Sequence, residues 1–254
     1  MRRAWCATAL VAAIAMAVLS LAPALGAEQD GDKVKIKRNQ EYDPVIDPAD
    51  FVDEIGDPLP IDNQYLPLIP GTSFLYQGET EDGTEEILVY VTYETKEILG
   101  VTCTVVRETA WLDGELAEDT FDWHAQDRYG NIWYFGEYTE EYEDGEVSTE
   151  GSWEAGVDGA KPGILMLADP GPGDSYRQEY YEDVAEDMAT VLRLNAQVSV
   201  AYSDFDNCLR TKEWTPLEPG SVEFKHYAPG LGLVLVTELK GGIVEIELVD
   251  IATD

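Results

Sequence analysis

Short runs of strand-forming residues, separated by turn dipeptides, occupy most of the chain. Asp113-Gly114 and Asp144-Gly145 each lie between two runs rich in β-branched and aromatic side chains. The tightest hairpin turn needs a positive φ at both central residues, and Asp-Gly adopts that conformation readily. The pattern predicts antiparallel strands joined by short hairpins, and therefore a mainly β fold.

The C-terminal segment repeats this pattern. Gly241-Gly242 separates two apolar runs, and in the second run Glu245 and Glu247 alternate with apolar residues. Such alternation is typical of a strand with one face in solvent. We expect residues 65–254 to form a single antiparallel curved sheet, or an incomplete β-barrel, of roughly ten to twelve strands.

Two segments depart from this simple alternation. Residues 151–173 are rich in glycine and proline, which predicts a long loop that covers one end of the sheet. Residues 176–194 mix strand-forming residues with a short acidic stretch. For them we expect strands with a break near residues 184–187.

The N-terminus has the composition of an export signal. Arg2 and Arg3 precede an apolar run, and small residues lead to Ala27. This is the order of a secretory signal peptide, residues 1–27, although an uncleaved membrane anchor is the alternative. The run is short for a span, so we expect cleavage, no membrane span in the mature chain, and a periplasmic or extracellular protein. Residues 28–64, acidic and proline-rich, are expected to be a disordered tail or a binding arm.

Charge excludes some partners. The chain holds 16 Lys and Arg against 51 Asp and Glu, a net charge of -35. That excess opposes nucleic-acid binding, because a phosphate backbone needs basic side chains. It also opposes binding to an anionic membrane surface. Since the acids are spread along the chain, we interpret them as a solvated surface suited to a salty, halophilic habitat.

Two cysteines remain once the signal is removed, Cys103 and Cys208. An even number in an exported protein predicts a disulfide between them. Two buried free thiols are the alternative.

The candidate ligand-binding residues gather around one predicted hairpin. On an extended strand Asp122, His124 and Gln126 share one face, and the next strand would bring Trp133 or Tyr134 close to His124. Aromatic side chains with a few polar groups line many ligand pockets. They also fill ordinary β cores, and the polar face is equally compatible with an exposed hairpin. The aromatic residues concentrated here are Trp111, Trp123, Trp133, Tyr134, Phe135, Tyr138 and Trp153.

Three segments resemble a family of uncharacterised secreted bacterial β proteins. They are PLIPGTSFLY at 67–76, VSVAYSDFDNCLRT at 198–211 and YAPGLGLV at 227–234. The resemblance implies a strongly curved half-barrel of the lipoprotein-carrier type and export from the cytoplasm. It implies no catalytic residue, and it leaves the acidic tail and the glycine-proline segment unexplained.

The sequence therefore favours an exported binding protein over an enzyme. We expect it to take a hydrophobic small molecule, a lipid-like group or a protein partner in the concave face of its sheet, using Asp122, His124, Gln126, Trp133, Tyr134 and Trp153. We expect no cofactor. The alternatives are calcium binding through carboxylates and a hydrolase that uses His124 with Asp122.

Overall fold

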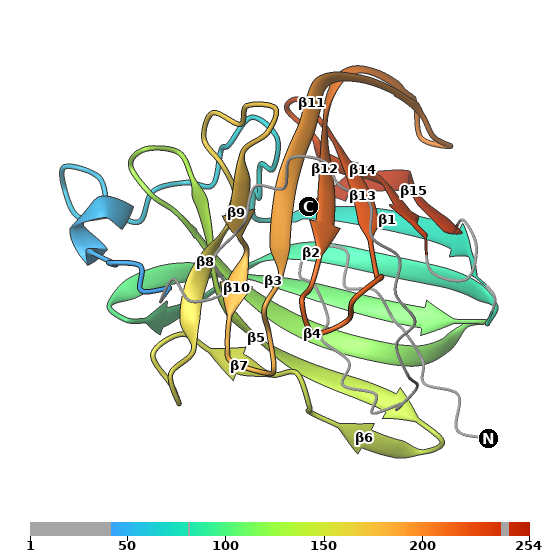
Figure 1. Cartoon of the computed structure of the whole chain (residues 1–254), viewed down its shortest axis with the longest axis horizontal. Helices are drawn as coiled ribbons and strands as arrows, with labels where there is room; N and C mark the ends of the chain where they lie inside the picture. Colours follow the sequence, from blue (N-terminus) through green and yellow to red (C-terminus); the bar gives the residue numbers. More distant parts are fainter. Residues whose placement is uncertain (1–41, 81, 240–243) are drawn as a thin grey trace, which may run out of the picture.

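The computed structural model describes residues 42–80, 82–239 and 244–254 (Figure 1). The predicted signal sequence, residues 28–41 of the predicted tail and the Gly241-Gly242 turn lie outside these residues.

The described residues form one 3-10 turn, η1 (Pro48–Phe51), and one sheet of fifteen antiparallel strands, so the predicted mainly β fold is confirmed. The strands are β1 (Thr72–Glu79), β2 (Thr84–Ile98), β3 (Val101–Leu112), β4 (Glu115–Gln126), β5 (Ile132–Glu143), β6 (Glu146–Ser148), β7 (Trp153–Glu154), β8 (Lys161–Met166), β9 (Ser175–Arg177), β10 (Glu179–Tyr180), β11 (Met188–Ser199), β12 (Asp204–Trp214), β13 (Glu223–Ala228), β14 (Gly232–Glu238) and β15 (Val244–Thr253).

Tight turns set the order of the strands. Asp113 and Gly114 have φ of 50° and 81°, and Asp144 and Gly145 have φ of 53° and 81°, as the Asp-Gly pattern predicts. Leu99-Gly100 makes a turn of the same kind, which the sequence does not signal because leucine rarely adopts a positive φ. The result is a meander from β1 to β5, and β1 pairs with β15 to continue the sheet through β14, β13, β12 and β11.

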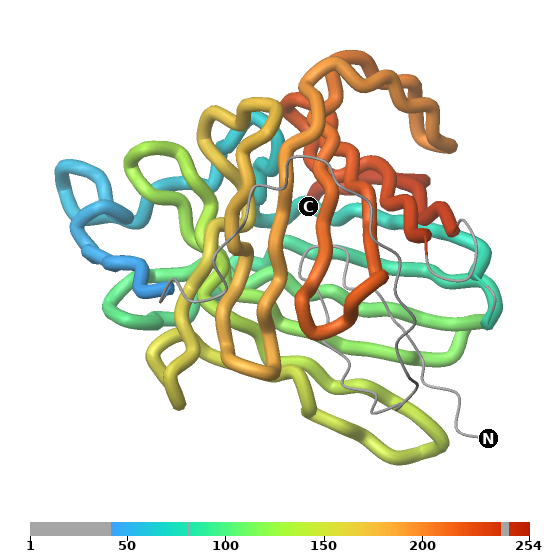
Figure 2. The backbone as a smooth tube through the Cα atoms, in the orientation of Figure 1, coloured from blue at the N-terminus to red at the C-terminus, as the bar shows by residue number. Residues whose placement is uncertain are grey.

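One short segment joins the two ends of this sheet. β9 pairs with β11 at one end, β10 pairs with β8 at the other, and Gln178 alone separates β9 from β10. The sheet is therefore barrel-shaped and nearly closed. In Figures 1 and 2 the strands β11–β13 run across β2–β4, as expected for two facing walls of such a sheet.

The interior of the barrel-shaped sheet is filled by side chains from both walls. Ile87 and Tyr134 are among the largest fully buried residues on one side, and Ile246 and Leu248 on the other. In β15 Ile246 and Leu248 are buried while Glu245 is exposed, so the predicted alternation is confirmed. Within the part of the chain that the structure describes, no helix is long and apolar enough to cross a lipid bilayer.

The sequence predicted one long loop for the glycine-proline segment, residues 151–173. This prediction is wrong, because the segment contains β7 and β8. Its composition reflects close strand contact. A Cβ at Gly163 would lie 2.2 Å from the backbone carbonyl carbon of Gln178, so only glycine lets β8 approach the β9–β10 segment.

The packed part of the chain begins before Tyr65. Phe51 and Ile61 are buried, and the Tyr42 hydroxyl donates a hydrogen bond to the Pro162 carbonyl at 2.8 Å. Residues 42–64, which composition assigns to the tail, therefore lie against the sheet.

The predicted disulfide is wrong. Cys103 on β3 and Cys208 on β12 are both free and buried. Five strands separate β3 from β12 in the order of the sheet, so the two cysteines do not lie on neighbouring strands. The alternative of two buried thiols holds. Cys103 lies within hydrogen-bond distance of the Val101 carbonyl, and burial raises its thiol pKa.

Candidate ligand-binding site

The β4–β5 hairpin supplies side chains to both faces of the sheet. Of the two neighbours that the sequence predicted for His124, Trp133 or Tyr134, the one that pairs with it is Tyr134, and Phe121 pairs with Tyr138. The faces alternate along β4, so Asp122, His124 and Gln126 point into the barrel and are buried. The alternative of an exposed hairpin face is therefore wrong. Phe121 and Trp123 belong to the opposite face, which we call the outer face.

A β-bulge in β5 adds a residue that the sequence did not predict. Asp122 pairs with Glu137 and His124 with Tyr134, so between these pairs two residues of β5 oppose one of β4. Gly136, with φ of 127°, lies in this bulge. Because of the extra residue, Tyr134 and Glu137 both reach Asp122, although residues three apart on a regular strand point to opposite faces.

Tyr134 is the centre of a buried acidic cluster. Its hydroxyl oxygen lies 2.8 Å from Asp122 Oδ1 and 2.9 Å from Glu137 Oε2. Glu179 of β10 is fully buried nearby, and neither of its carboxyl oxygens is hydrogen-bonded to another described residue. The Trp153 indole stands edge-on to Tyr134, with ring centroids 5.3 Å apart. Its N–H lies close to Glu179 but not in hydrogen-bonding geometry.

Burial favours the neutral forms of these groups. It raises the pKa of Asp122 to about 7 and holds the pKa values of Glu137 and Glu179 well above their usual range. Burial also lowers the pKa of His124 to about 3. Among the described residues neither His124 nitrogen has a hydrogen-bond partner, so His124 and Asp122 do not form a hydrogen-bonded dyad. The imidazole stacks on Tyr134 at 4.9 Å between ring centroids.

The other predicted site residues lie at the edge of this cluster. Gln126 donates to Asp62 Oδ1 at 2.7 Å and accepts from the Asp62 backbone N–H. The Trp133 indole N–H donates to Asp127 Oδ2 at 2.9 Å, and the ring packs against Phe51. Both contacts fix the end of the hairpin. The structure thus brings Asp122, His124, Tyr134 and Trp153 together, with Gln126 and Trp133 set apart.

The outer face carries a groove of about 660 Å³. We call it the outer groove. Its walls are aromatic and apolar side chains of β3, β4, β5 and the β7 region, and its rim is charged. The lining residues are Glu94, Thr95, Lys96, Val105, Phe121, Trp123, Glu137, Tyr138, Ser152, Trp153, Glu154 and Val157. Glu137 and Trp153 connect this groove to the buried acidic cluster.

Lys96 occupies part of the outer groove. Its Nζ lies 3.2 Å from the centroid of the Trp123 ring and 2.7 Å from Glu154 Oε2. About a third of each of the Lys96 and Glu154 side chains is exposed, at 34% and 35%. An ammonium over an indole face is an attractive cation–π arrangement. The sequence did not indicate Lys96 as a site residue, because β3 lies between it and Trp123 in the sheet.

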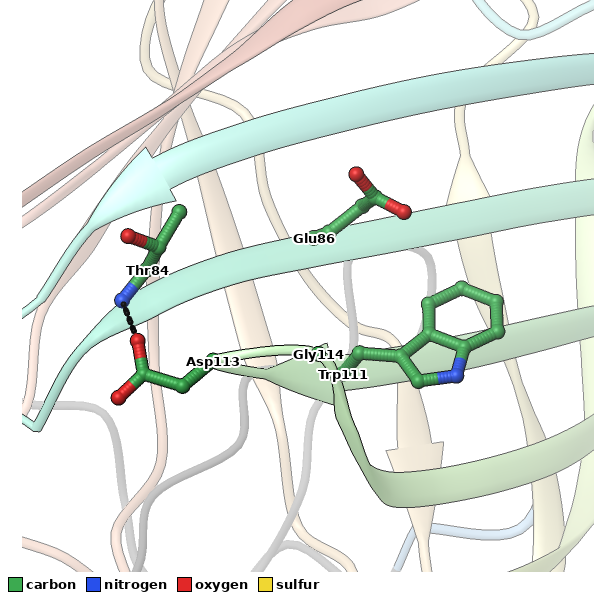
Figure 3. A pocket seen from close by; sticks show the side chains of 5 residues that line it. All are labelled: Thr84, Glu86, Trp111, Asp113 and Gly114. Atoms are coloured by element: carbon green, nitrogen blue, oxygen red, sulfur yellow. Dashed lines mark hydrogen bonds between the residues drawn. The ribbon is translucent and has the colours of Figure 1, made fainter.

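A second hollow of about 510 Å³ lies at a hairpin turn, lined by Thr84, Glu86, Trp111, Asp113 and Gly114 (Figure 3). Asp113 Oδ1 accepts a hydrogen bond from the Thr84 backbone N–H at 3.0 Å. This carboxylate therefore ties the β3–β4 turn to the start of β2, and Figure 3 shows Trp111 pointing away from it.

A calcium site needs several oxygen ligands that converge on one point. Within residues 42–80, 82–239 and 244–254, no group of three or more His, Cys, Asp or Glu side chains is placed so that it could hold a metal ion. Calcium binding, which the acidic composition left open, has no candidate site among them.

Comparison with known proteins gives two structural matches. A Bacteroides fragilis protein, described as exported with a YmcC-like fold, is 17% identical, with a TM-score of 0.44 over 75% of this chain and 100% of its own. A Parabacteroides distasonis protein described as a lipoprotein is 11% identical, with a TM-score of 0.42 over 75% of this chain and 99% of its own. No family model matches the chain, and no curated protein matches its sequence. Neither match assigns a ligand or an activity to this chain.

Proposed function

We propose that the protein is an exported, non-catalytic binding protein and that its ligand presents a flat apolar face to the outer groove. The observation that carries this proposal is the row of aromatic side chains on the outer face, with Phe121 opposite Tyr138 and with Trp123 beside them. Ligand pockets typically combine such an apolar lining with a few polar groups.

The outer groove replaces the concave face that the sequence favoured. The concave side is filled by packed side chains, and its polar residues Asp122 and His124 are 1% and 0% exposed. The aromatic hairpin still supplies the wall, and Ser152 to Val157 supply part of the rim. Catalysis by His124 with Asp122 is not favoured, because the two side chains share no hydrogen bond and are shielded from solvent.

Titration with the neutral dye Nile red tests this proposal. Wild type should give a saturable rise in dye emission. Tyr138→Ala should weaken binding about fivefold, the effect expected for loss of one aromatic contact. Tyr138 is 41% exposed, so the substitution should not unfold the protein.

Tyr129→Ala is the matched control, since Tyr129 is 68% exposed and does not line the outer groove. Dye binding that is absent from wild type, or equal in wild type and Tyr138→Ala, would contradict the proposal.

A further inference from the structure

The contacts of Lys96 indicate which kind of chemical group the outer groove can bind. Its ammonium is held by two groups at once, the face of the Trp123 ring at 3.2 Å and the Glu154 carboxylate at 2.7 Å. Such a pairing of an aromatic face with a carboxylate is the usual recognition element for an organic cation. The chain thus places one of its own cations where the ammonium of a ligand would be stabilised.

A second ring in the same row also binds a cation. The Arg107 guanidinium carbon lies 5.4 Å from the Phe121 ring centroid, and Asp119 fixes the guanidinium through hydrogen bonds of 2.7 and 2.8 Å. Tyr138 lies opposite Phe121 and is 41% exposed. The Tyr138 ring carries no cation among the contacts of the described residues, so it is available to a ligand.

The charge around the groove favours cations. Glu94, Glu137 and Glu154 are among the lining residues, and Lys96 is the single base among them. The whole chain carries a net charge of -35, which raises the local concentration of cations and repels anions.

From these contacts we infer that the outer groove binds a small organic ammonium compound, whose cationic group replaces the Lys96 ammonium over Trp123 and pairs with Glu154. This inference rests on the proposed function and adds the class of ligand. Lys96 is suited to such an exchange because its flexible stem and partly exposed ammonium can move into solvent.

An isosteric pair of probes tests the inference. Phenyltrimethylammonium and tert-butylbenzene have the same shape and differ in charge, and binding of each is followed by isothermal titration calorimetry or tryptophan fluorescence. The cation should bind at least about tenfold more tightly than the neutral probe. Added salt should weaken binding of the cation but not of the neutral probe.

Three variants test whether the ligand takes the place of the Lys96 ammonium or responds only to the net charge of the protein. Lys96→Met should tighten binding of the cation about tenfold, because it removes the internal competitor. Glu154→Gln should weaken binding of the cation and leave the neutral probe unchanged. Lys212→Met makes the same change in net charge on β12, outside the groove, and should alter neither affinity by more than about twofold.

Each result decides between the two proposals. Equal binding of the two probes would overturn the organic-cation inference and leave the groove as a binding site for apolar ligands. Binding of the cation that weakens in Lys96→Met would also overturn the inference, since Lys96 would then support the ligand instead of competing with it. If neither probe nor Nile red binds, the proposed function itself fails.

Discussion

Tyr134 shows how a single hydroxyl constrains protonation in the interior. One O–H proton cannot be donated to both Asp122 Oδ1 and Glu137 Oε2, which lie at 2.8 and 2.9 Å. The second contact is a hydrogen bond only if that carboxyl carries a proton and donates it to the tyrosine oxygen. Both contacts are full hydrogen bonds when one carboxyl of the pair is neutral, which is the form that burial favours.

Glu137→Gln tests this assignment, because glutamine copies the shape and the donor of a protonated glutamate. Burial raises the pKa of Glu137 well above its usual range, so the wild type loses stability as pH rises above the unfolded-state value. The variant should therefore be more stable than wild type by about 1–3 kcal/mol at pH 8. The gain should shrink toward zero near pH 4.5 in urea unfolding.

The exposed Glu115 of the neighbouring strand provides a control, and Glu115→Gln should change stability by less than about 0.5 kcal/mol. A Glu137→Gln protein that is less stable than wild type at pH 8 would show that Glu137 is ionised in the fold.

At the scale of the element, the bulge in β5 decides which side chains meet. A Cβ at Gly136 would lie 2.3 Å from the Trp153 carbonyl oxygen, and the backbone there has φ of 127°. Gly136→Ala should therefore destabilise the fold by about 3 kcal/mol in urea unfolding, through both strain and displacement of β7.

A substitution at Gly145 distinguishes backbone strain from displacement of β7. Gly145 also has a positive φ, 81°, but an added Cβ would have no described atom within 4 Å. Gly145→Ala should cost only about 1 kcal/mol. Equal losses in the two variants would mean that the contact with Trp153 is not what requires glycine at position 136.

The same bulge explains how much of the site the sequence could predict. Alternation along 122–126 and the turn after it placed His124 beside Trp133 or Tyr134, and the pairing shows that its partner is Tyr134. Glu137 could not be predicted, because a bulge changes the face and leaves no mark beyond a lone glycine. Glu179 was also missed, since it reaches the cluster through closure of the sheet by β10, a contact far apart in sequence.

At the scale of the whole molecule, the buried acids set a pH dependence that surface charge alone would not give. Burial raises the pKa values of Glu118, Asp122 and Asp187 to about 7 each. Lys225 is a buried base near this network, ion-paired with Glu213 at 3.0 Å, and its pKa is raised by Glu213 and Glu223. Lys225 therefore stays charged over the range in which these carboxyls titrate.

The sign of the pH effect follows from these shifts. An acid whose pKa is raised on folding contributes stability that is fully present below the unfolded-state pKa, near 4, and is lost as pH rises to about 7. The histidines oppose this trend, since burial lowers the pKa of His124 to about 3 and of His226 to about 4. Their contribution is lost as pH falls below the unfolded-state value of about 6.5.

Because the buried acids outnumber the two histidines, we expect maximum stability at mildly acidic pH. The thermal midpoint should be higher at pH 5 than at pH 8 by at least about 5 °C, measured by circular dichroism in buffers of equal ionic strength. Surface repulsion in a chain of net charge -35 acts in the same direction but is screened by salt. The buried contribution should therefore persist in 1 M NaCl, and a difference that disappears there would assign the whole effect to the surface.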